Sequence, residues 1–195
     1  MTSLTLRLAG PSDAYGLAEM HIAAWQSAFR GMLPDDFLDG LTVAGRAERW
    51  QQVLTETARH VWVVSEAERI VGFVSIGASR DDDACPGQTG EIYAFYVHPD
   101  RWRHGIGSML MAQALRELHR LGYVEATLWV LRGNMQAKSF YEAAGFVPDG
   151  GAKIDVNPAG ISFDEVRYRR IVRDQAPMSP PVTIISTKEP NDADR

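Results

Sequence analysis

Residues 97–108 read VHPDRWRHGIGS, and this stretch decides how the rest of the chain is interpreted. A strand-like apolar run, residues 91–97, ends in a His-Pro pair, a short basic loop follows, and residues 105–121 have the apolar spacing of an amphipathic helix. Gly105 and Gly107 stand where this helix begins, so free backbone N–H groups are expected at the positive end of the helix dipole. A strand, a glycine turn and a helix in this order predict a site for a phosphate group.

The loop between this strand and this helix also carries basic side chains. Arg101, Arg103 and His104 raise the electrostatic potential where the helix N–H groups are free. A pair of glycines alone is a weak motif, because a tight turn that needs glycine for packing gives the same pattern. The chain lacks G-x-x-x-x-G-K-[ST] and a full G-x-G-x-x-G near its start, which excludes the two common nucleotide-binding schemes.

Length and composition bound the class of protein. The 195 residues, 45% hydrophobic and 23% charged, fit one ordinary domain. The formal net charge of −5 argues against a dedicated nucleic-acid binder, and the single cysteine, Cys85, excludes an intramolecular disulfide. We find no apolar run of the roughly 18 residues that a membrane span needs and no signal-peptide pattern at the start, so a cytoplasmic location is expected.

The composition of the chain changes near residue 173. Residues 1–173 alternate between strand-like and helix-like stretches, whereas residues 174–195 hold four of the ten prolines and little to bury. We therefore predict one folded domain over 1–173 and a proline-rich, flexible tail over 174–195. A short edge strand at residues 182–186 stays open.

The folded part reads as a mixed sheet flanked by helices, an α/β (α+β) fold class. Strands are predicted at residues 5–8, 61–64, 70–76, 91–97, 125–130, 146–148 and 166–172, and helices at residues 11–29, 42–57, 105–121 and 135–144. Residues 31–40 are broken by Gly and Pro, and residues 79–89 read as a loop.

Three blocks of sequence carry a resemblance to a known family. They are residues 91–99, EIYAFYVHP, the glycine turn at 105–107, and residues 134–146, NMQAKSFYEAAGF. In this order they make residues 4–172 resemble the GCN5-related N-acetyltransferases, the GNAT superfamily, whose motifs read [QR]-x-x-G-x-[GA] and N-x-x-A-x-x-[FL]-Y-x-x-x-G-F. The resemblance implies a mostly antiparallel central sheet, splayed at the coenzyme site, and acetyl transfer from acetyl-CoA to an amine.

The resemblance also implies the coenzyme-binding residues. The main chain of Phe95 and Val97 would pair with the pantetheine arm, and the Val97 N–H would polarise the acetyl carbonyl. The loop and helix start would bind the phosphates through Arg103, His104, Gly105, Ile106, Gly107 and Ser108. Asn134 resembles a coenzyme-contacting asparagine, although a helix N-cap explains it equally well.

One position departs from the family pattern. The usual Gln or Arg of the loop motif falls on Trp102, so whether Arg101 or Arg103 supplies the charge stays open.

Two residues are candidates for the chemistry. Tyr141 resembles the tyrosine that protonates the departing thiolate, and the alternative is an ordinary core aromatic. Glu91 is the candidate general base, directly or through water, because an alkylammonium ion with a pKa near ~10 must lose a proton before attack. The alternative is a solvated glutamate at a strand end. Tyr93 and Tyr96 are expected to line the cleft.

The sequence says less about the pocket that would bind the amine acceptor. Residues 25–34 resemble the first-helix region of GNAT members that act on small molecules, so Trp25, Phe29 and Phe37 are candidate apolar walls, with helix packing as the alternative. The acidic run at 81–83 could attract a cationic amine, but such runs are usually solvated loops. No metal site is expected, because His98 and His104 lack a third ligand, and Cys85 has no histidine partner.

The sequence thus favours an enzyme that moves the acetyl group of acetyl-CoA to a primary amine of a small molecule or peptide in a ternary complex. The competing hypothesis is a non-catalytic acyl-CoA-binding or sensing module, supported by Trp102 and by the absence of an obvious base. The expected partners are acetyl-CoA and the amine, with no nucleic acid and no membrane, and a homodimer stays open.

Overall fold

The computed structural model describes residues 3–172, and within them seven strands form one sheet in the order β1-β2-β3-β4-β5-β7-β6. The strands are β1 (Leu4–Leu8), β2 (His60–Glu66), β3 (Arg69–Ala78), β4 (Thr89–Val97), β5 (Glu125–Leu131), β6 (Val147–Val156) and β7 (Ser162–Ile171). The helices are α1 (Ala14–Ala28), α2 (Asp35–Asp39), α3 (Val43–Thr55), α4 (Ile106–Arg120) and α5 (Met135–Ala143), with 3-10 turns at Pro11–Asp13 and Pro99–Arg101. The predicted mixed sheet flanked by helices is confirmed.

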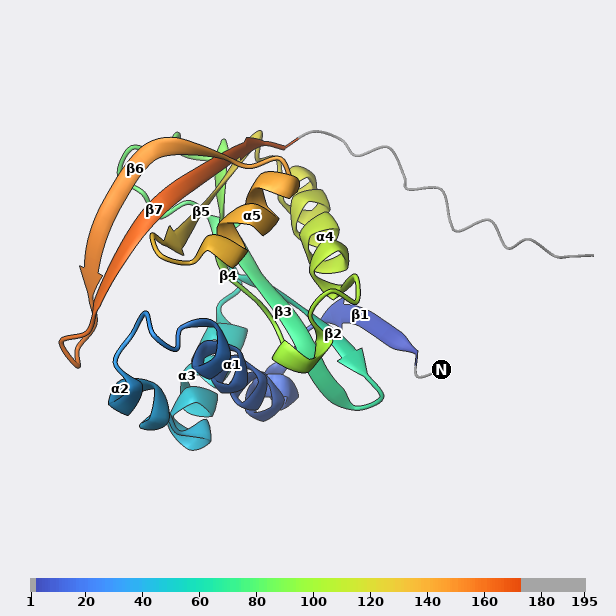
Figure 1. Ribbon diagram of the computed structural model, residues 1–195. Coiled ribbons are helices and arrows are strands. Elements are labelled where there is room, and N and C mark those ends of the chain that lie inside the picture. Colours follow the sequence, from blue (N-terminus) through green and yellow to red (C-terminus); the bar gives the residue numbers. More distant parts are fainter. Residues whose placement is uncertain (1–2, 173–195) are drawn as a thin grey trace, which may run out of the picture.

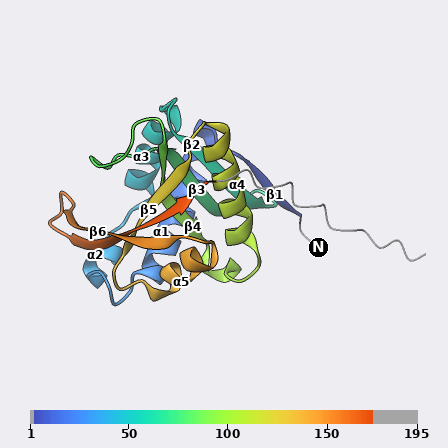
Figure 2. The same cartoon turned by 90° about the horizontal axis from the view of Figure 1, so that it is seen from above.

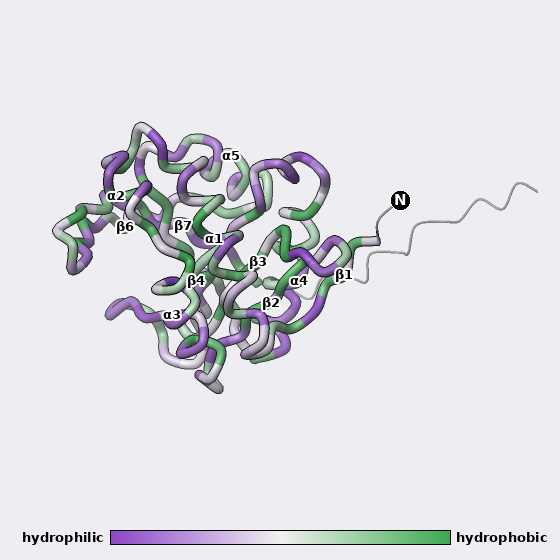
Figure 3. Tube along the Cα trace, turned by 90° about the horizontal axis from the view of Figure 1, so that it is seen from below, coloured by the Kyte–Doolittle hydropathy of each residue, from purple (hydrophilic) through white to green (hydrophobic). Residues whose placement is uncertain are grey.

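Helices cover both faces of the sheet (Figure 1). Val63 and Phe73 pack against α1 and α3, whereas Val64 and Val74, which point to the opposite face, pack against α4. Every residue of β3 except its two ends is buried, as expected for a strand covered on both sides. Figure 3 colours the chain by hydropathy and shows hydrophobic segments along the inner strands of the sheet.

The sheet opens between β4 and β5. These two strands form the parallel pair of the described sheet, and they pair only through residues 89–92 and 125–128. Beyond Ile92, β4 stays paired with β3, while β5 continues alongside β7. The splay that the family resemblance implied is therefore present.

The helix that follows β4 begins where the glycine turn predicted. Gly105 has φ +80°, a left-handed conformation that other residues adopt only with strain, and it caps α4. Ile106 and Leu110 anchor the helix on β3 at Gly72, where an added Cβ would lie 3.0 Å from both side chains. The close contact fixes the N-terminus of α4 beside the end of β4.

Two elements differ from the sequence expectations. The last two strands, predicted at 146–148 and 166–172, are longer than expected: β6 and β7 make a long hairpin whose far end lies on the side of α2 (Figures 1 and 2). The strand β6 was not predicted at its full length because it contains glycines at 150 and 151 and many polar residues. It is an edge strand, and its stability depends on pairing with β7. Residues 35–39 form the short helix α2. Pro34 is its N-cap residue and Gly40 is its C-cap residue.

The predicted tail at 174–195 and its edge strand at 182–186 lie outside the described residues. Within residues 3–172, no helix combines the length and apolar character that crossing a membrane requires.

Candidate active site

Two clefts open near the residues where β4 and β5 separate. The loop cleft, of about 770 Å³, lies between the loop that precedes α4 and helix α5. The hairpin cleft, of about 670 Å³, lies between α1, α3 and the β6–β7 hairpin. Phe95, Tyr96 and Tyr141 line both clefts and mark their junction.

The main chain of β4 faces the gap at alternate residues. The His98 N–H donates to the Val71 carbonyl at 2.8 Å, and Val97 lies opposite Gly72 in the same antiparallel register. Hydrogen-bonding direction alternates along a strand, so the N–H and C=O groups of Phe95 and Val97 point away from β3. Both residues line the loop cleft. The predicted pantetheine-binding positions therefore present backbone groups to the opening.

The start of α4 lies at the other side of the loop cleft. Arg103, Gly105, Gly107 and Ser108 line it, and the first turn of the helix leaves backbone N–H groups without intrahelical partners. Two predicted residues contribute differently. The Ile106 side chain is buried in the core, which leaves only its backbone available, and the His104 side chain is not part of the lining.

The loop before α4 is held by Trp102. Its indole N–H donates to the Val97 carbonyl at 2.8 Å, and its own carbonyl bonds the His104 ring at 2.7 Å. Arg101 forms an ion pair with Glu66 at 2.6 Å, whereas Arg103 has no carboxylate partner in the described part of the chain. Arg103 is thus the cation available to a ligand, and the residue that departs from the family motif ties the loop to β4.

Asn134 caps helix α5. Its side-chain oxygen accepts a hydrogen bond from the Ala137 N–H at 3.0 Å, and the residue also lines the loop cleft. The predicted N-cap is confirmed, and its position leaves it next to any ligand in that cleft.

Tyr141 lies at the junction of the clefts. It is 8% exposed on α5, with its ring packed against Phe95 and Phe146 at centroid distances of 6.2 Å. Burial raises the pKa of Tyr141, so the phenol stays protonated at neutral pH. A protonated phenol is the form that can donate a proton.

Glu91 lies in the hairpin cleft and is not solvated. The residue is 1% exposed, so the alternative of a solvent-facing strand end is wrong. Its carboxylate accepts from the Arg80 backbone N–H at 2.9 Å and pairs with the Arg80 guanidinium at 2.5 Å. The hydrogen bond to Glu91 raises the pKa of Arg80. The pair places a held carboxylate at the wall of the cleft.

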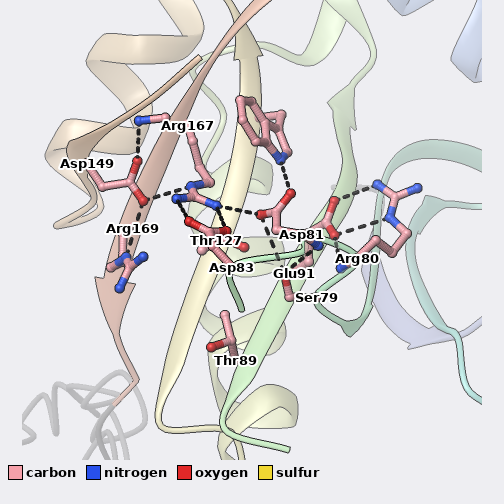
Figure 4. A network of polar contacts seen from close by, with 12 residues as sticks. Ser79, Arg80, Asp81, Asp83, Thr89, Glu91, Thr127, Asp149, Arg167 and Arg169 are labelled. Atoms are coloured by element: carbon pink, nitrogen blue, oxygen red, sulfur yellow. Dashed lines mark hydrogen bonds and ion pairs between the residues drawn. The ribbon is translucent and has the colours of Figure 1, made fainter. Parts of the chain in front are cut away.

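The acidic loop after β3 is a structural anchor (Figure 4). Arg167 of β7 pairs with Asp83 at 2.6 Å, Asp81 at 3.1 Å and Asp149 at 2.8 Å. The Trp129 indole N–H also donates to Asp81, at 2.9 Å. The expectation of a solvated acidic run is wrong for Asp81, whose side chain is 13% exposed. The Asp83 side chain is 61% exposed and still pairs with Arg167. Arg167 lies more than 80 positions from both residues in the sequence. This network fixes the hairpin to the body of the protein.

Aromatic side chains form the apolar part of the hairpin cleft. Trp25, Phe29 and Phe37 line it as predicted, and so do Tyr93 and Tyr96. Phe163 of the hairpin completes this wall, with its ring centroid 6.1 Å from that of Trp25.

Sequence reasoning missed the basic side chains of this cleft. Arg46 and Arg49 line it from α3, and Lys153 lines it from β6. Arg46 and Arg49 are three positions apart in a predicted helix, so the sequence did indicate that they share one face of it.

Comparison with known proteins identifies the family. The model of the acetyltransferase (GNAT) family matches residues 22–146. The chain belongs to the GNAT family of acetyltransferases. It is 27% identical over 164 residues to the uncharacterized N-acetyltransferase YuaI of Bacillus subtilis, a match that covers 84% of this chain and 90% of YuaI.

Solved GNAT structures share the fold. The PaiA N-acetyltransferase of Thermoplasma acidophilum, solved in complex with coenzyme A, matches with a TM-score of 0.67 at 16% identity, over 87% of this chain and 99% of that one. Salmonella typhimurium yncA, solved with its cofactor acetyl-CoA, matches with a TM-score of 0.64 at 20% identity, over 89% and 96%. The family match ends at residue 146, so the β6–β7 hairpin lies beyond it.

Proposed function

We propose that the protein is an N-acetyltransferase that moves the acetyl group of acetyl-CoA directly to a primary amine in a ternary complex. The observation that carries this proposal is the junction of the two clefts, where backbone groups of β4 and the protonated phenol of Tyr141 meet. The loop cleft takes the coenzyme, and the hairpin cleft takes the amine.

The coenzyme is bound mainly by backbone groups. The first turn of α4 and the Arg103 guanidinium face the pyrophosphate. The pantetheine arm lies in the gap between β4 and β5 and pairs with Phe95 and Val97 as an added strand would. The PaiA and yncA structures, which were solved with coenzyme A and acetyl-CoA, support this assignment.

The transfer then proceeds without a covalent enzyme intermediate. The neutral amine attacks the thioester carbon while the Val97 N–H stabilises the developing charge on the carbonyl oxygen. As the tetrahedral intermediate collapses, the C–S bond breaks and Tyr141 gives its proton to the thiolate sulfur. The proton lost by the nitrogen restores the phenol through solvent, which leaves an amide and free coenzyme A.

The ammonium form of the acceptor must first lose a proton, and we assign this step to Glu91 acting through water. Its carboxylate lines the hairpin cleft, but Arg80 occupies both oxygens and so keeps it from direct contact with the amine. A water hydrogen-bonded to this carboxylate transfers the proton from the ammonium group.

The test is release of free coenzyme A across a panel of primary amines. Tyr141→Phe is expected to lower kcat by roughly 10²-fold or more, because the leaving thiolate loses its acid. Tyr15→Phe, which alters an exposed tyrosine of α1, is the matched control and should behave as wild type. Equal turnover by Tyr141→Phe contradicts the assigned role. Tight acetyl-CoA binding by calorimetry without turnover of any amine would support the acyl-CoA-binding module instead.

A further inference from the structure

A small pocket lined by arginines adjoins the hairpin cleft. It has a volume of about 130 Å³, and the polar residues that line it include Arg46, Arg49, Arg59, Arg80, His21 and Ser75. No Asp or Glu of the described residues lines it. Arg46, Arg49 and Arg80 also line the hairpin cleft, so the two spaces are continuous.

The arginines of this pocket are only partly neutralised. Arg59 pairs with Glu56 at 2.9 Å, and Arg80 pairs with Glu91. Arg46 and Arg49 have no carboxylate partner between residues 3 and 172. Arg46 is half-buried with its guanidinium 4.8 Å above the Trp25 ring, and this burial lowers the pKa of Arg46.

A partly desolvated guanidinium without a counter-charge is costly, so this arrangement favours an anionic ligand.

Two buried polar side chains point to the same conclusion. His21 is 7% exposed and Ser75 is 1% exposed. Neither ring nitrogen of His21 nor the Ser75 hydroxyl has a hydrogen-bond partner among the described residues. Burial, with the charges of Arg46 and Arg49, lowers the pKa of His21, so its ring is neutral and carries one N–H donor. Buried polar groups are nearly always satisfied, so these unpartnered side chains beside the pocket favour an occupant that carries acceptor oxygens.

From these observations we infer that the arginine pocket binds an anionic oxygen group of the acceptor, a carboxylate or a phosphate. The acceptor is then a small molecule that carries both a primary amine and an acid. A water takes about 30 Å³ of liquid, so the pocket has room for either acidic group. This inference rests on the proposed function, because it assigns the substrate class of the same site.

The register of β4 gives one component of the distance between the acid and the amine of this acceptor. The arginine pocket reaches β4 at Tyr93 and Ala94, and the reacting groups lie at Phe95 and Val97. A strand rises about 3.3 Å per residue, so Ala94 and Val97 lie roughly 10 Å apart along the strand. The acceptor series should therefore vary the number of bonds between the acid and the amine.

The first experiment compares matched acceptors. A series of amino carboxylates and amino phosphates is assayed beside the corresponding amides and plain alkylamines. Either the amino carboxylates or the amino phosphates are expected to show a kcat/KM at least tenfold above that of the matching neutral amines. The class that shows this preference identifies the anionic group that the pocket binds. Equal turnover of acids and neutral amines overturns the inference and leaves the acetyltransferase function intact.

Variants of the pocket test the same preference. Arg46→Gln and Arg49→Gln should each raise KM for the acids about tenfold without changing KM for alkylamines, and Arg46→Lys should restore part of the loss. Arg116→Gln, at an exposed arginine of α4, is the matched control. An equal effect of Arg46→Gln on acids and neutral amines contradicts an anion-binding role.

A second measurement does not depend on acetyl transfer. Tryptophan fluorescence is titrated with inorganic phosphate and with glutarate, because Trp25 lies under Arg46 and Trp50 lines the pocket. Wild type should show a saturable change with at least one anion that is absent in Arg46→Gln. This result would stand even if no amine were acetylated, whereas no saturable change with either anion overturns the pocket.

Discussion

The two clefts present different kinds of chemical group at their surfaces. The loop cleft presents backbone groups of β4 and of the first turn of α4, and all of its elements except the start of α1 lie within the family match at residues 22–146. The hairpin cleft presents charged and aromatic side chains, and one of its walls is the β6–β7 hairpin beyond that match. Backbone recognition tolerates sequence change, whereas side-chain recognition is specific to one chain.

Strand β4 serves both clefts at once. Phe95 and Val97 turn their main chain toward the gap between β4 and β5, and Glu91 and Tyr93 line the hairpin cleft. Substitutions of residues that line one cleft alone should therefore leave binding to the other cleft unchanged. Measuring amine kinetics and coenzyme affinity in the same variant tests whether the two clefts are independent.

The largest effect is expected at Glu91. Glu91→Gln should lower kcat/KM for the amine about 10²-fold, because the acceptor loses its route for deprotonation, while the dissociation constant of acetyl-CoA stays within twofold. Steady-state kinetics and calorimetry measure the two quantities. Glu165→Gln is the informative comparison, since Glu165 also lines the hairpin cleft and burial raises its pKa. A larger loss in Glu165→Gln than in Glu91→Gln would reassign the base.

The next largest effect is expected at Arg167. Arg167→Met leaves Asp81 and Asp149 without their shared cation, so the free energy of unfolding should fall by about 3 kcal/mol. KM for the amine should rise about tenfold, because the hairpin wall loosens, with no change in coenzyme affinity. Chemical denaturation and kinetics measure both. Arg132→Met, which removes an exposed ion pair with Asp164, is the control and should leave stability nearly unchanged.

A substitution at Trp102 tests whether the loop cleft can be altered without affecting the hairpin cleft. Trp102→Phe keeps an aromatic ring but removes the N–H that bonds the Val97 carbonyl, so acetyl-CoA should bind about fivefold more weakly, equivalent to about 1 kcal/mol. KM for the amine should not change. Trp62→Phe is the control, because the Trp62 indole nitrogen has no hydrogen-bond partner among the described residues. A shift in amine KM without a shift in coenzyme affinity would contradict the separation.

The smallest effect concerns pH. Burial raises the pKa of Tyr141 above its ordinary value of about 10, so the protonated, active form persists as pH rises through that value. With an acceptor amine that is already neutral, kcat should stay level between pH 8 and pH 10. A decline with a midpoint below pH 10 that is missing in Tyr141→Phe would show that the phenol ionises early.

Local patterns predicted the loop cleft well. The apolar run of β4, the glycine turn and the amphipathic spacing of α4 are contiguous in sequence, so propensity and capping specify them without tertiary information. The helix starts at Thr42 and Asn134 were also predicted, and both side chains accept the expected capping hydrogen bonds.

The hairpin cleft could not be predicted in this way. Arg167 meets Asp81 across the fold, and the arginine pocket gathers His21, Arg46 and Ser75 from three separate elements. Periodicity reports which face of an element is buried, but it does not report which charged residue of another element lies against it. The charge of Asp81 was visible in the sequence, and its partner was not.

The gap between β4 and β5 has a consequence for the thermodynamics of the whole domain. Past Ile92 no strand of the described chain pairs with the open edge of β4, and in the binding mode that we propose the pantetheine arm of the coenzyme supplies the missing partner. Binding and folding are then linked equilibria, and coenzyme at about 100 times its dissociation constant adds about 2.7 kcal/mol to the stability of the native state. The melting temperature of this acetyltransferase is therefore a function of its coenzyme supply, and the amide protons of Phe95 and Val97 should exchange with solvent most slowly when that supply is highest.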